Sequence, residues 1–251
     1  MQHKGVAIVT GAGSGIGRAT AVRLASDGYN VILAGRRESA LTETAGLIGV
    51  GGGAMVITCD VTAVDAVRSM VALTTEAFGR IDVVVNNAGI SRTAEFSKVD
   101  IRDWREVMAA DVESIVLVTQ AALPGLLESG GSVVNVASVA GLGGDPRMTV
   151  YNAAKGAVVN LTRSLAVELA PQGVRVNAVA PSLTLTDAVA DIPHDDLAEF
   201  VRRIPMGRAA QPAEIADVIA FLAGPDSRFV TGVVLPVDGG LRASSGQPPH
   251  R

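Results

Sequence analysis

The sequence predicts an α/β fold in which helices cover both faces of a parallel sheet. Short β-rich runs alternate with helical patterns along the chain, which is the arrangement that builds parallel sheets through right-handed crossovers. Hydrophobic residues make up 48% of the 251 residues and charged residues only 18%, as expected for a sheet buried on both faces. A glycine-rich segment also lies between the first predicted strand and the first predicted helix.

The predicted strands are Val6–Thr10, Val31–Ala34, Ala54–Thr58, Ile81–Val85, Ser132–Ala137, Arg175–Ala178 and Val233–Pro236. Helical patterns lie near 16–27, 39–47, 63–78, 101–128, 152–170 and 213–223. We interpret 141–147 and 181–195 as loops at the carboxyl edge of the sheet, where open α/β sheets bind ligands. The pattern contains no repeat or linker, so we predict one domain over residues 1–251. The tail 239–251 is not helical in pattern, and we expect it either to fray or to pack on a neighbouring subunit.

Composition and charge argue against several classes of protein. The net charge of −4 and the pI near 5.4 give no electrostatic reason to expect DNA or RNA as a partner. Cys59 is the only cysteine, so no intrachain disulfide can form, which suits a reducing cytosol. The three histidines are scattered, so we predict no metal site. The first strand leaves no space for a signal peptide and no apolar run approaches ~20 residues, so we expect a cytoplasmic protein without a membrane span.

The glycine-rich segment Thr10–Gly17 reads TGAGSGIG. Glycines let the backbone turn tightly and approach a pyrophosphate, whose negative charge is favoured by the amino end of a helix. Because the segment joins a strand to a helix, it predicts a dinucleotide phosphate site rather than a flexible turn. The residues that we expect to line this site are Gly11, Ser14, Gly15, Ile16 and Gly17.

The end of the second predicted strand indicates which dinucleotide binds. An acid at this place binds the adenosine ribose hydroxyls and favours NAD. Here Gly35 removes that acid and Arg36 offers a cation for a 2′-phosphate, so we favour NADP. The alternative is that Arg36 and Arg37 are the solvated start of a helix. Asp60 follows the third strand and can accept from the adenine amino group, or else lie beside the cap of the helix from Thr62.

Ser138, Tyr151 and Lys155 form a Ser–x12–Tyr–xxx–Lys pattern. A tyrosine and a lysine four residues apart on a helix project from the same face. The lysine charge can then lower the pKa of a phenol from its usual value near ~10, so that it exchanges a proton with a substrate oxygen. The serine hydroxyl can hydrogen-bond the same oxygen. The alternative is that the tyrosine packs and the lysine is solvated, as in many helices.

Taken in order, TGxxxGIG, Asp60, Asn86-Asn87-Ala88-Gly89, Ser138 and Tyr151-xxx-Lys155 resemble the short-chain dehydrogenase/reductase family over residues 5–240. The resemblance implies a Rossmann-type fold, a three-layer sandwich with strand order 3-2-1-4-5-6-7. It implies that Tyr151 is the acid/base, that Ser138 orients the reacting oxygen and that Lys155 binds the nicotinamide ribose. It also implies a homotetramer formed through helices 101–128 and 152–170. The further cofactor-binding residues that it implies are Val61, Asn87, Ala88, Gly89, Pro181, Thr184 and Thr186.

Two positions depart from the family pattern. Ser182 stands where the family usually has glycine after the proline. Asp111 stands where the family usually has an asparagine that holds a water in a proton relay to the lysine. A carboxylate can still hold that water, and it stabilises the protonated lysine while partly cancelling the lysine field at the tyrosine. We therefore expect Asp111 to serve in a working relay whose rate profile is more alkaline than that of the Asp111→Asn variant.

Segments near the predicted site indicate the substrate. Ser138–Asp145, Pro181–Thr184 and the SSGQPP tail are similar to those of acetoin reductases and meso-2,3-butanediol dehydrogenases. They favour an NAD(P)-dependent oxidoreductase that transfers hydride between nicotinamide and a small hydroxy-ketone or diol. A 3-oxoacyl thioester on an acyl carrier protein is the alternative substrate, and a nucleotide-binding regulator or a scaffold is the alternative role. We expect the segment Leu183–Arg203 either to move over the site or to form a rigid helical cap.

Overall fold

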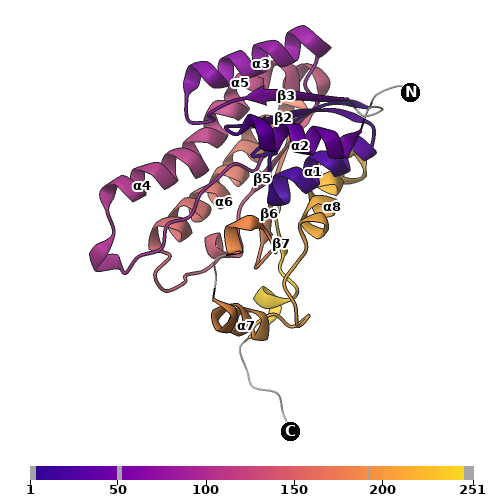
Figure 1. The fold of residues 1–251 in the computed structure, drawn as a ribbon. Coiled ribbons are helices and arrows are strands. Elements are labelled where there is room, and N and C mark those ends of the chain that lie inside the picture. The colour runs from indigo at the N-terminus through magenta and orange to yellow at the C-terminus, as the bar shows by residue number, and fades with distance from the viewer. Residues whose placement is uncertain (1–3, 50–52, 191–192, 246–251) are drawn as a thin grey trace.

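In a computed structural model, residues 4–49, 53–190 and 193–245 are described, and within them seven strands form one parallel sheet. The strand order is β3-β2-β1-β4-β5-β6-β7, which confirms the predicted order. Figure 1 shows this sheet between two layers of helices. The strands are β1 (Gly5–Thr10), β2 (Tyr29–Gly35), β3 (Ala54–Thr58), β4 (Val83–Asn86), β5 (Ser132–Val136), β6 (Arg175–Pro181) and β7 (Val234–Val237).

One face of the sheet carries α1, α2 and α8, and the other face carries α3, α5 and α6 (Figure 1). The amino half of the chain supplies α1 (Gly15–Ser26), α2 (Glu38–Ile48), α3 (Val64–Phe78) and α4 (Ile101–Met108). The rest of the chain supplies α5 (Ser114–Ser129), α6 (Thr149–Leu169), α7 (His194–Arg202) and α8 (Pro212–Ala223).

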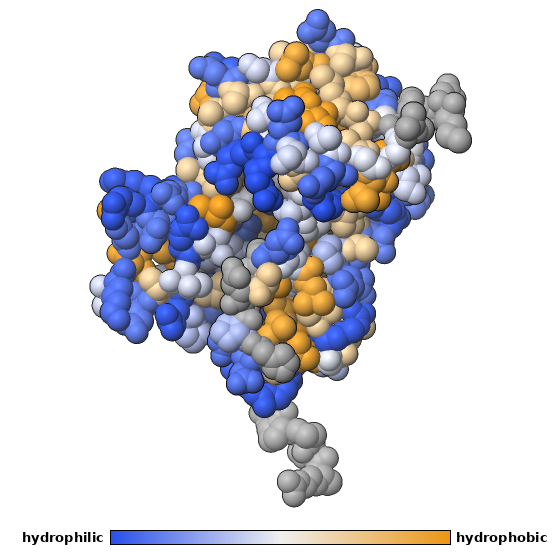
Figure 2. Space-filling view, viewed as in Figure 1, coloured by the Kyte–Doolittle hydropathy of each residue, from blue (hydrophilic) through white to orange (hydrophobic). Residues whose placement is uncertain are grey.

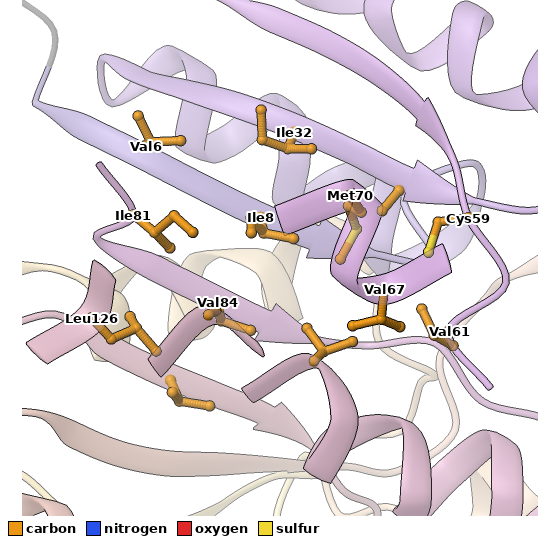
Figure 3. Close-up of a cluster of buried hydrophobic side chains, with 14 of the residues drawn as sticks. Val6, Ile8, Ile32, Cys59, Val61, Val67, Met70, Ile81, Val84 and Leu126 are labelled. Atoms are coloured by element: carbon orange, nitrogen blue, oxygen red, sulfur yellow. The ribbon is translucent and has the colours of Figure 1, made fainter. Parts of the chain in front are cut away.

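Two apolar cores result from the alternation of side chains along each strand. In β1, Val6 and Ile8 face the core under α3 and α5, whereas Ala7 and Val9 face the core under α1 and α8. Figure 3 shows the first of these cores, where the strand side chains meet Met70 of α3. Because both faces are buried, most strand residues are apolar, and the strands do not alternate regularly between apolar and polar residues.

The predicted helix near 101–128 is interrupted in the structure. Helix α4 ends at Met108, a π-helical turn covers Ala109–Glu113, and α5 begins at Ser114. By length and composition alone, the whole stretch Ile101–Ser129 is the one candidate membrane span among the described residues. Core helices meet the same criteria, and the α5 residues Val118 and Leu126 are fully buried against the sheet.

Part of the predicted loop 181–195 is also helical. A 3-10 turn covers Asp187–Val189, and α7 begins at His194, so the segment Leu183–Arg203 contains the helical element that we considered as a cap. In the tail, Leu241–Ala243 forms a 3-10 turn where no helical pattern was predicted. Residues 246–251 lie outside the described part of the chain, and the expected contact of the tail with another subunit stays a prediction.

A buried polar network crosses the centre of the sheet. Asn86 Nδ2 donates to Asn135 Oδ1 over 2.9 Å and to Thr119 Oγ1 over 3.1 Å. Asn135 Nδ2 donates in turn to Thr162 Oγ1 over 3.0 Å. The network ties β4 and β5 to α5 and α6, the helix that carries Tyr151 and Lys155.

We predict that Asn135→Ala lowers the free energy of unfolding by about 2 to 4 kcal/mol, because it leaves the Asn86 amide and the Thr162 hydroxyl short of a buried partner. Urea unfolding followed by circular dichroism measures this loss. Thr162→Val breaks only one of these bonds to Asn135 and serves as the control with a smaller loss. Equal stability of Asn135→Ala and the parent chain would show that the network does not stabilise the fold.

Candidate active site

The residues predicted to form the site lie at one edge of the sheet. All seven strands run parallel, so their carboxyl ends share that edge. The glycine segment follows β1, Arg36 follows β2, Asp60 and Val61 follow β3, and Asn87–Gly89 follow β4. Ser138 follows β5, and Pro181 ends β6 just before Thr184 and Thr186. Figure 2 shows a hollow in the surface between the regions of α4 and α7.

The turn after β1 is tied to the end of β4. Thr10 Oγ1 accepts from the backbone N–H groups of Asn87 and Ala88 over 3.0 and 3.1 Å. Asn87 Nδ2 donates back to Thr10 O over 2.9 Å. A Cβ atom on Gly17 would lie 2.2 Å from Gly11 O and 2.5 Å from Asn87 Nδ2, so only glycine allows α1 to begin this close to the strand.

The amino end of α1 has the features of an anion site. Ser14 is the N-cap residue, but its side chain makes no capping hydrogen bond, and the first turn of α1 contains no acidic residue. The first N–H groups of the helix therefore remain available for a ligand. Gly15 has φ +51, and a Cβ atom there would lie 2.9 Å from Thr186 Cγ2, which places the segment after β6 beside this helix end. These features fit the pyrophosphate of a dinucleotide.

Asp60 lies beside Arg36 in the region predicted for adenosine. Asp60 Oδ1 accepts from Thr62 N over 3.0 Å and from Thr62 Oγ1 over 2.7 Å. These bonds, together with the charge of Arg36, hold the pKa of the Asp60 carboxyl below its usual value. Asp60 thus forms a turn shortly before α3, which begins at Val64. Arg36 is exposed, and its contact with a 2′-phosphate stays a prediction.

Tyr151 and Lys155 lie on α6, which packs against the end of β5 and against the turn that follows Ser138. Lys155 lies on α6 one turn after Tyr151, and its Nζ atom is 5.6 Å from the centroid of the Tyr151 ring. Lys155 Nζ donates to Val136 O, at the end of β5, over 3.0 Å. Ser138 Oγ accepts from Ala140 N over 3.1 Å and lies 3.5 Å from Pro181 O. The two residues on α6 therefore share a face, as predicted.

Asp111 contacts Lys155 directly, at the position where the family resemblance implied a water-mediated relay. Asp111 Oδ2 lies 3.0 Å from Lys155 Nζ, and both side chains are buried, with exposed fractions of 0% and 6%. Asp111 Oδ1 accepts from Ile90 N over 2.7 Å. A Cβ atom on Gly89 would lie 2.8 Å from Asp111 Oδ2, so the glycine leaves room for the carboxylate. The carboxylate neutralises the charge of the buried ammonium. The neutral amide of an asparagine at this position supplies no counter-charge.

The pair keeps the buried lysine charged. Burial alone lowers the pKa of the Lys155 ammonium, but the charges of Tyr151 and Asp111 outweigh it and raise the pKa above its ordinary value of 10.5. Asp111 lies in the π-helical turn between α4 and α5, and such turns often occur at functional sites.

Sequence reasoning missed three contributors to this site. Two of them are the backbone groups Val136 O and Ile90 N, which carry no side-chain signal. The third is Asn152, whose amide donates to Gly143 O and Asp145 Oδ2, in the segment that connects Ser138 to Tyr151. Its only sequence signal is a position next to Tyr151.

Comparison with known proteins identifies the class to which this fold and site belong. The family model described as enoyl-(acyl carrier protein) reductase matches residues 11–242. A crystal structure of a short-chain type dehydrogenase/reductase from Mycobacterium marinum superimposes with a TM-score of 0.92 at 35% identity, covering 96% of this chain and 97% of the other. The chain belongs to the short-chain dehydrogenase/reductase family, whose members use NAD(P) and act on CH–OH groups.

Three relatives match nearly the whole chain. The meso-2,3-butanediol dehydrogenase of Serratia marcescens is 44% identical over 97% of this chain and 96% of its own length. The cis-4-hydroxycyclohexanecarboxylate dehydrogenase of Sinomonas cyclohexanicum is 42% identical, over 95% and 96%. A 3-oxoacyl-[acyl-carrier-protein] reductase of Thermotoga maritima is 39% identical, over 94% and 97%.

We predict that Asp111→Asn lowers the free energy of unfolding at neutral pH by about 3 kcal/mol, because it leaves the Lys155 charge buried without a counter-charge. Folding raises the pKa of Lys155, so the ion pair stabilises the folded state fully at neutral pH and up to about pH 10.5. This stabilisation is lost as the pH rises through the raised pKa. Urea unfolding at neutral and alkaline pH should therefore show a difference between the two proteins that shrinks at high pH.

The control is Asp65→Asn, which breaks an exposed pair with Arg68 at 3.8 Å and should change stability little. If the loss in Asp111→Asn is no larger than in this control, or does not depend on pH, the ion pair does not stabilise the fold.

Proposed function

We propose that this protein interconverts a secondary alcohol and a ketone, with Tyr151 as the acid/base. The observation that carries the proposal is the buried lysine held beside the Tyr151 ring at 5.6 Å, on the helix against which the turn after Ser138 packs. A nucleotide-binding regulator or a scaffold has no need for a lysine whose charge is maintained at such a desolvation cost.

In the proposed reaction, Tyr151 gives its phenolic proton to the carbonyl oxygen of a ketone, or takes the proton from an alcohol. Ser138 Oγ hydrogen-bonds the same oxygen and orients it. A bound nicotinamide supplies the other half of the chemistry by delivering or accepting hydride. Lys155 keeps a positive charge beside Tyr151 and binds the nicotinamide ribose. Asp111 holds that lysine in place.

We infer that NADP is preferred over NAD, because Gly35 leaves the end of β2 without an acid and Arg36 is exposed beside it. The proposed cofactor residues are Gly11, Ser14, Gly15, Ile16, Gly17, Arg36, Asp60, Val61, Asn87, Ala88, Gly89, Pro181, Thr184 and Thr186. A homotetramer in the cytoplasm is the assembly and location that we propose.

For the substrate we propose a small hydroxy-ketone or diol. The name of the Serratia marcescens relative supports this choice. The second candidate is a 3-oxoacyl thioester, which is supported by the description of the family model and by the name of the Thermotoga maritima relative. The two candidates differ in size and charge, so a direct comparison of rates separates them.

We predict that the purified protein oxidises NADPH when acetoin or diacetyl is added, and that Tyr151→Phe abolishes this activity because it removes the transferable proton. The absorbance of the reduced cofactor measures the rate, with NADH and a 3-oxoacyl thioester tested in parallel. Faster turnover of the thioester would identify it, rather than the small ketone, as the substrate. A preference for NADH would overturn the proposed contact of Arg36 with a 2′-phosphate. Binding of both cofactors without turnover would favour the regulator.

We predict that Asp111→Asn shifts the pH profile of kcat/KM towards lower pH. The Asp111 charge lies 3.0 Å from Lys155 Nζ and partly cancels its field at Tyr151, so removing it strengthens the effect of the lysine on the proton transfer. Steady-state rates over a pH series measure the shift, with salt and buffer kept constant. Superimposable pH profiles of the two proteins would show that the Asp111 charge does not affect proton transfer.

A further inference from the structure

The segment between Ser138 and Tyr151 is fastened to α6 by the side chain that follows Tyr151. We propose that Asn152 is a positioning residue, which fixes residues 142–148 and thereby the placement of Ser138 relative to Tyr151. The catalytic consequence rests on the proposed function, whereas the fastening of the segment does not.

The Asn152 side chain makes two hydrogen bonds, and both reach into this segment. Its Nδ2 atom donates to Gly143 O over 3.1 Å and to Asp145 Oδ2 over 3.2 Å. An amide NH₂ group has two donors, so both are used on the segment. Asp145 is exposed and makes no ion pair within the described part of the chain, so its bond to Asn152 is its link to the helix.

The same segment is held on either side of the Asn152 contacts. On the Ser138 side, a Cβ atom on Gly141 would lie 2.5 Å from the Lys155 backbone, so the turn after Ser138 packs directly on α6. On the Tyr151 side, Arg147 O accepts from Ala94 N over 2.9 Å. Arg147 has φ 65, which makes it the one non-glycine residue of the described chain with positive φ. Asn152 thus supplies the polar anchor between two backbone contacts.

The remaining polar atom of Asn152 shows that these bonds fix the amide orientation. Asn152 Oδ1 is buried and has no hydrogen-bond partner among the described residues. Rotating the amide would bring Oδ1 against Gly143 O and the Asp145 carboxylate, two acceptors that repel it. The side chain therefore leaves one buried acceptor unsatisfied, which costs free energy, while it holds the segment with both donors. Packing alone would be served as well by an apolar residue.

The position of Asn152 connects this anchor to catalysis. It adjoins Tyr151 in the first turns of α6, and Ser138 caps the 3-10 turn that leads into the fastened segment. Proton transfer requires both hydroxyl groups to reach one substrate oxygen, and a misplacement of about 1 Å can cost ~10²-fold in rate. Loosening residues 142–148 is expected to lower kcat/KM for the ketone while cofactor binding at the distant glycine segment stays unchanged.

Hydrogen exchange tests the fastening without reference to activity. In Asn152→Ala, amides of residues 142–148 should exchange faster than in the parent chain, while the glycine segment after β1 exchanges as before. Unchanged exchange in 142–148 overturns the proposal. If the protein turns over no alcohol or ketone at all, the proposed function fails, and the exchange result still decides whether Asn152 fixes the segment.

Kinetics test the positioning role. For Asn152→Ala we expect kcat/KM for the ketone to fall by about 10- to 100-fold, with an unchanged cofactor Kd and an unshifted pH profile. Gln172→Ala is the control, because Gln172 is an exposed amide residue in the turn after α6, outside the helices through which we expect the tetramer to form. Faster exchange with unchanged kcat/KM overturns the positioning role, as does a loss that the control shares.

Exchanging the two side chains of the Asn152–Asp145 hydrogen bond distinguishes a positioning role from a general loss of structure. Asn152→Asp faces Gly143 O and Asp145 with a carboxylate and should lose more activity than Asn152→Ala. In the double variant with Asp145→Asn, the amide at position 145 can donate to the carboxylate at position 152. One hydrogen bond is then restored with donor and acceptor exchanged. We expect the double variant to recover part of the kcat/KM that Asn152→Asp loses, and an absence of recovery overturns the proposal.

Discussion

A buried lysine requires a counter-charge, and the site depends on how Asp111 supplies it. Burying an ammonium alone costs several kcal/mol, whereas a well-placed carboxylate and hydrogen-bonded neighbours offset that cost. The surroundings of Lys155 meet this requirement from three elements: the carboxylate in the π-helical turn, the Val136 carbonyl at the end of β5, and Ile90 N, which holds the carboxylate from the segment after β4. Gly89 is needed because any side chain there would occupy the space of Asp111.

The sheet determines where these elements can meet. The carboxyl ends of parallel strands lie at one edge of the sheet. Polar side chains near that edge hydrogen-bond neighbouring strands to each other, so the loops that follow these strands are held together. Thr10 and Asn87 join the ends of β1 and β4, while Asn86 and Asn135 join β4, β5 and the helices above them. The proposed dinucleotide site and the proposed proton-transfer groups are thus parts of one hydrogen-bonded frame.

The sequence predicted the features that depend on local patterns. Apolar runs identified the seven strands, the TGAGSGIG turn identified the start of α1, and the spacing of Tyr151 and Lys155 placed both on one helical face. The strand order came from the family resemblance, since the pattern alone does not order strands. Helix α7 was not among the predicted helices and was considered only as a helical cap within Leu183–Arg203. Pro193 precedes it and Asp195 and Asp196 lie in its first turn, which is a recognised start signal.

The direct contact between Asp111 and Lys155 could not be predicted in the same way. It depends on a π-helical turn, whose extra residue per turn changes which side chains face the core, and no residue type marks such a turn. It also depends on a backbone donor, Ile90 N, which is identical in every non-proline residue. Residue identity showed that Asp111 departs from the family pattern, but only the fold showed that it reaches the lysine.

The direct contact still leaves Lys155 able to serve a dinucleotide. An ammonium has three N–H donors. The Val136 carbonyl takes one, and the side that faces Asp111 engages at most one more, so one donor remains for a ribose hydroxyl. Asp111 Oδ2 has no aligned hydrogen bond among the described residues, so its contribution is mainly the charge. The carboxylate therefore weakens the field of the lysine at Tyr151 but leaves the last donor of the lysine free. Asp111 departs from the family pattern and is still compatible with the proposed chemistry.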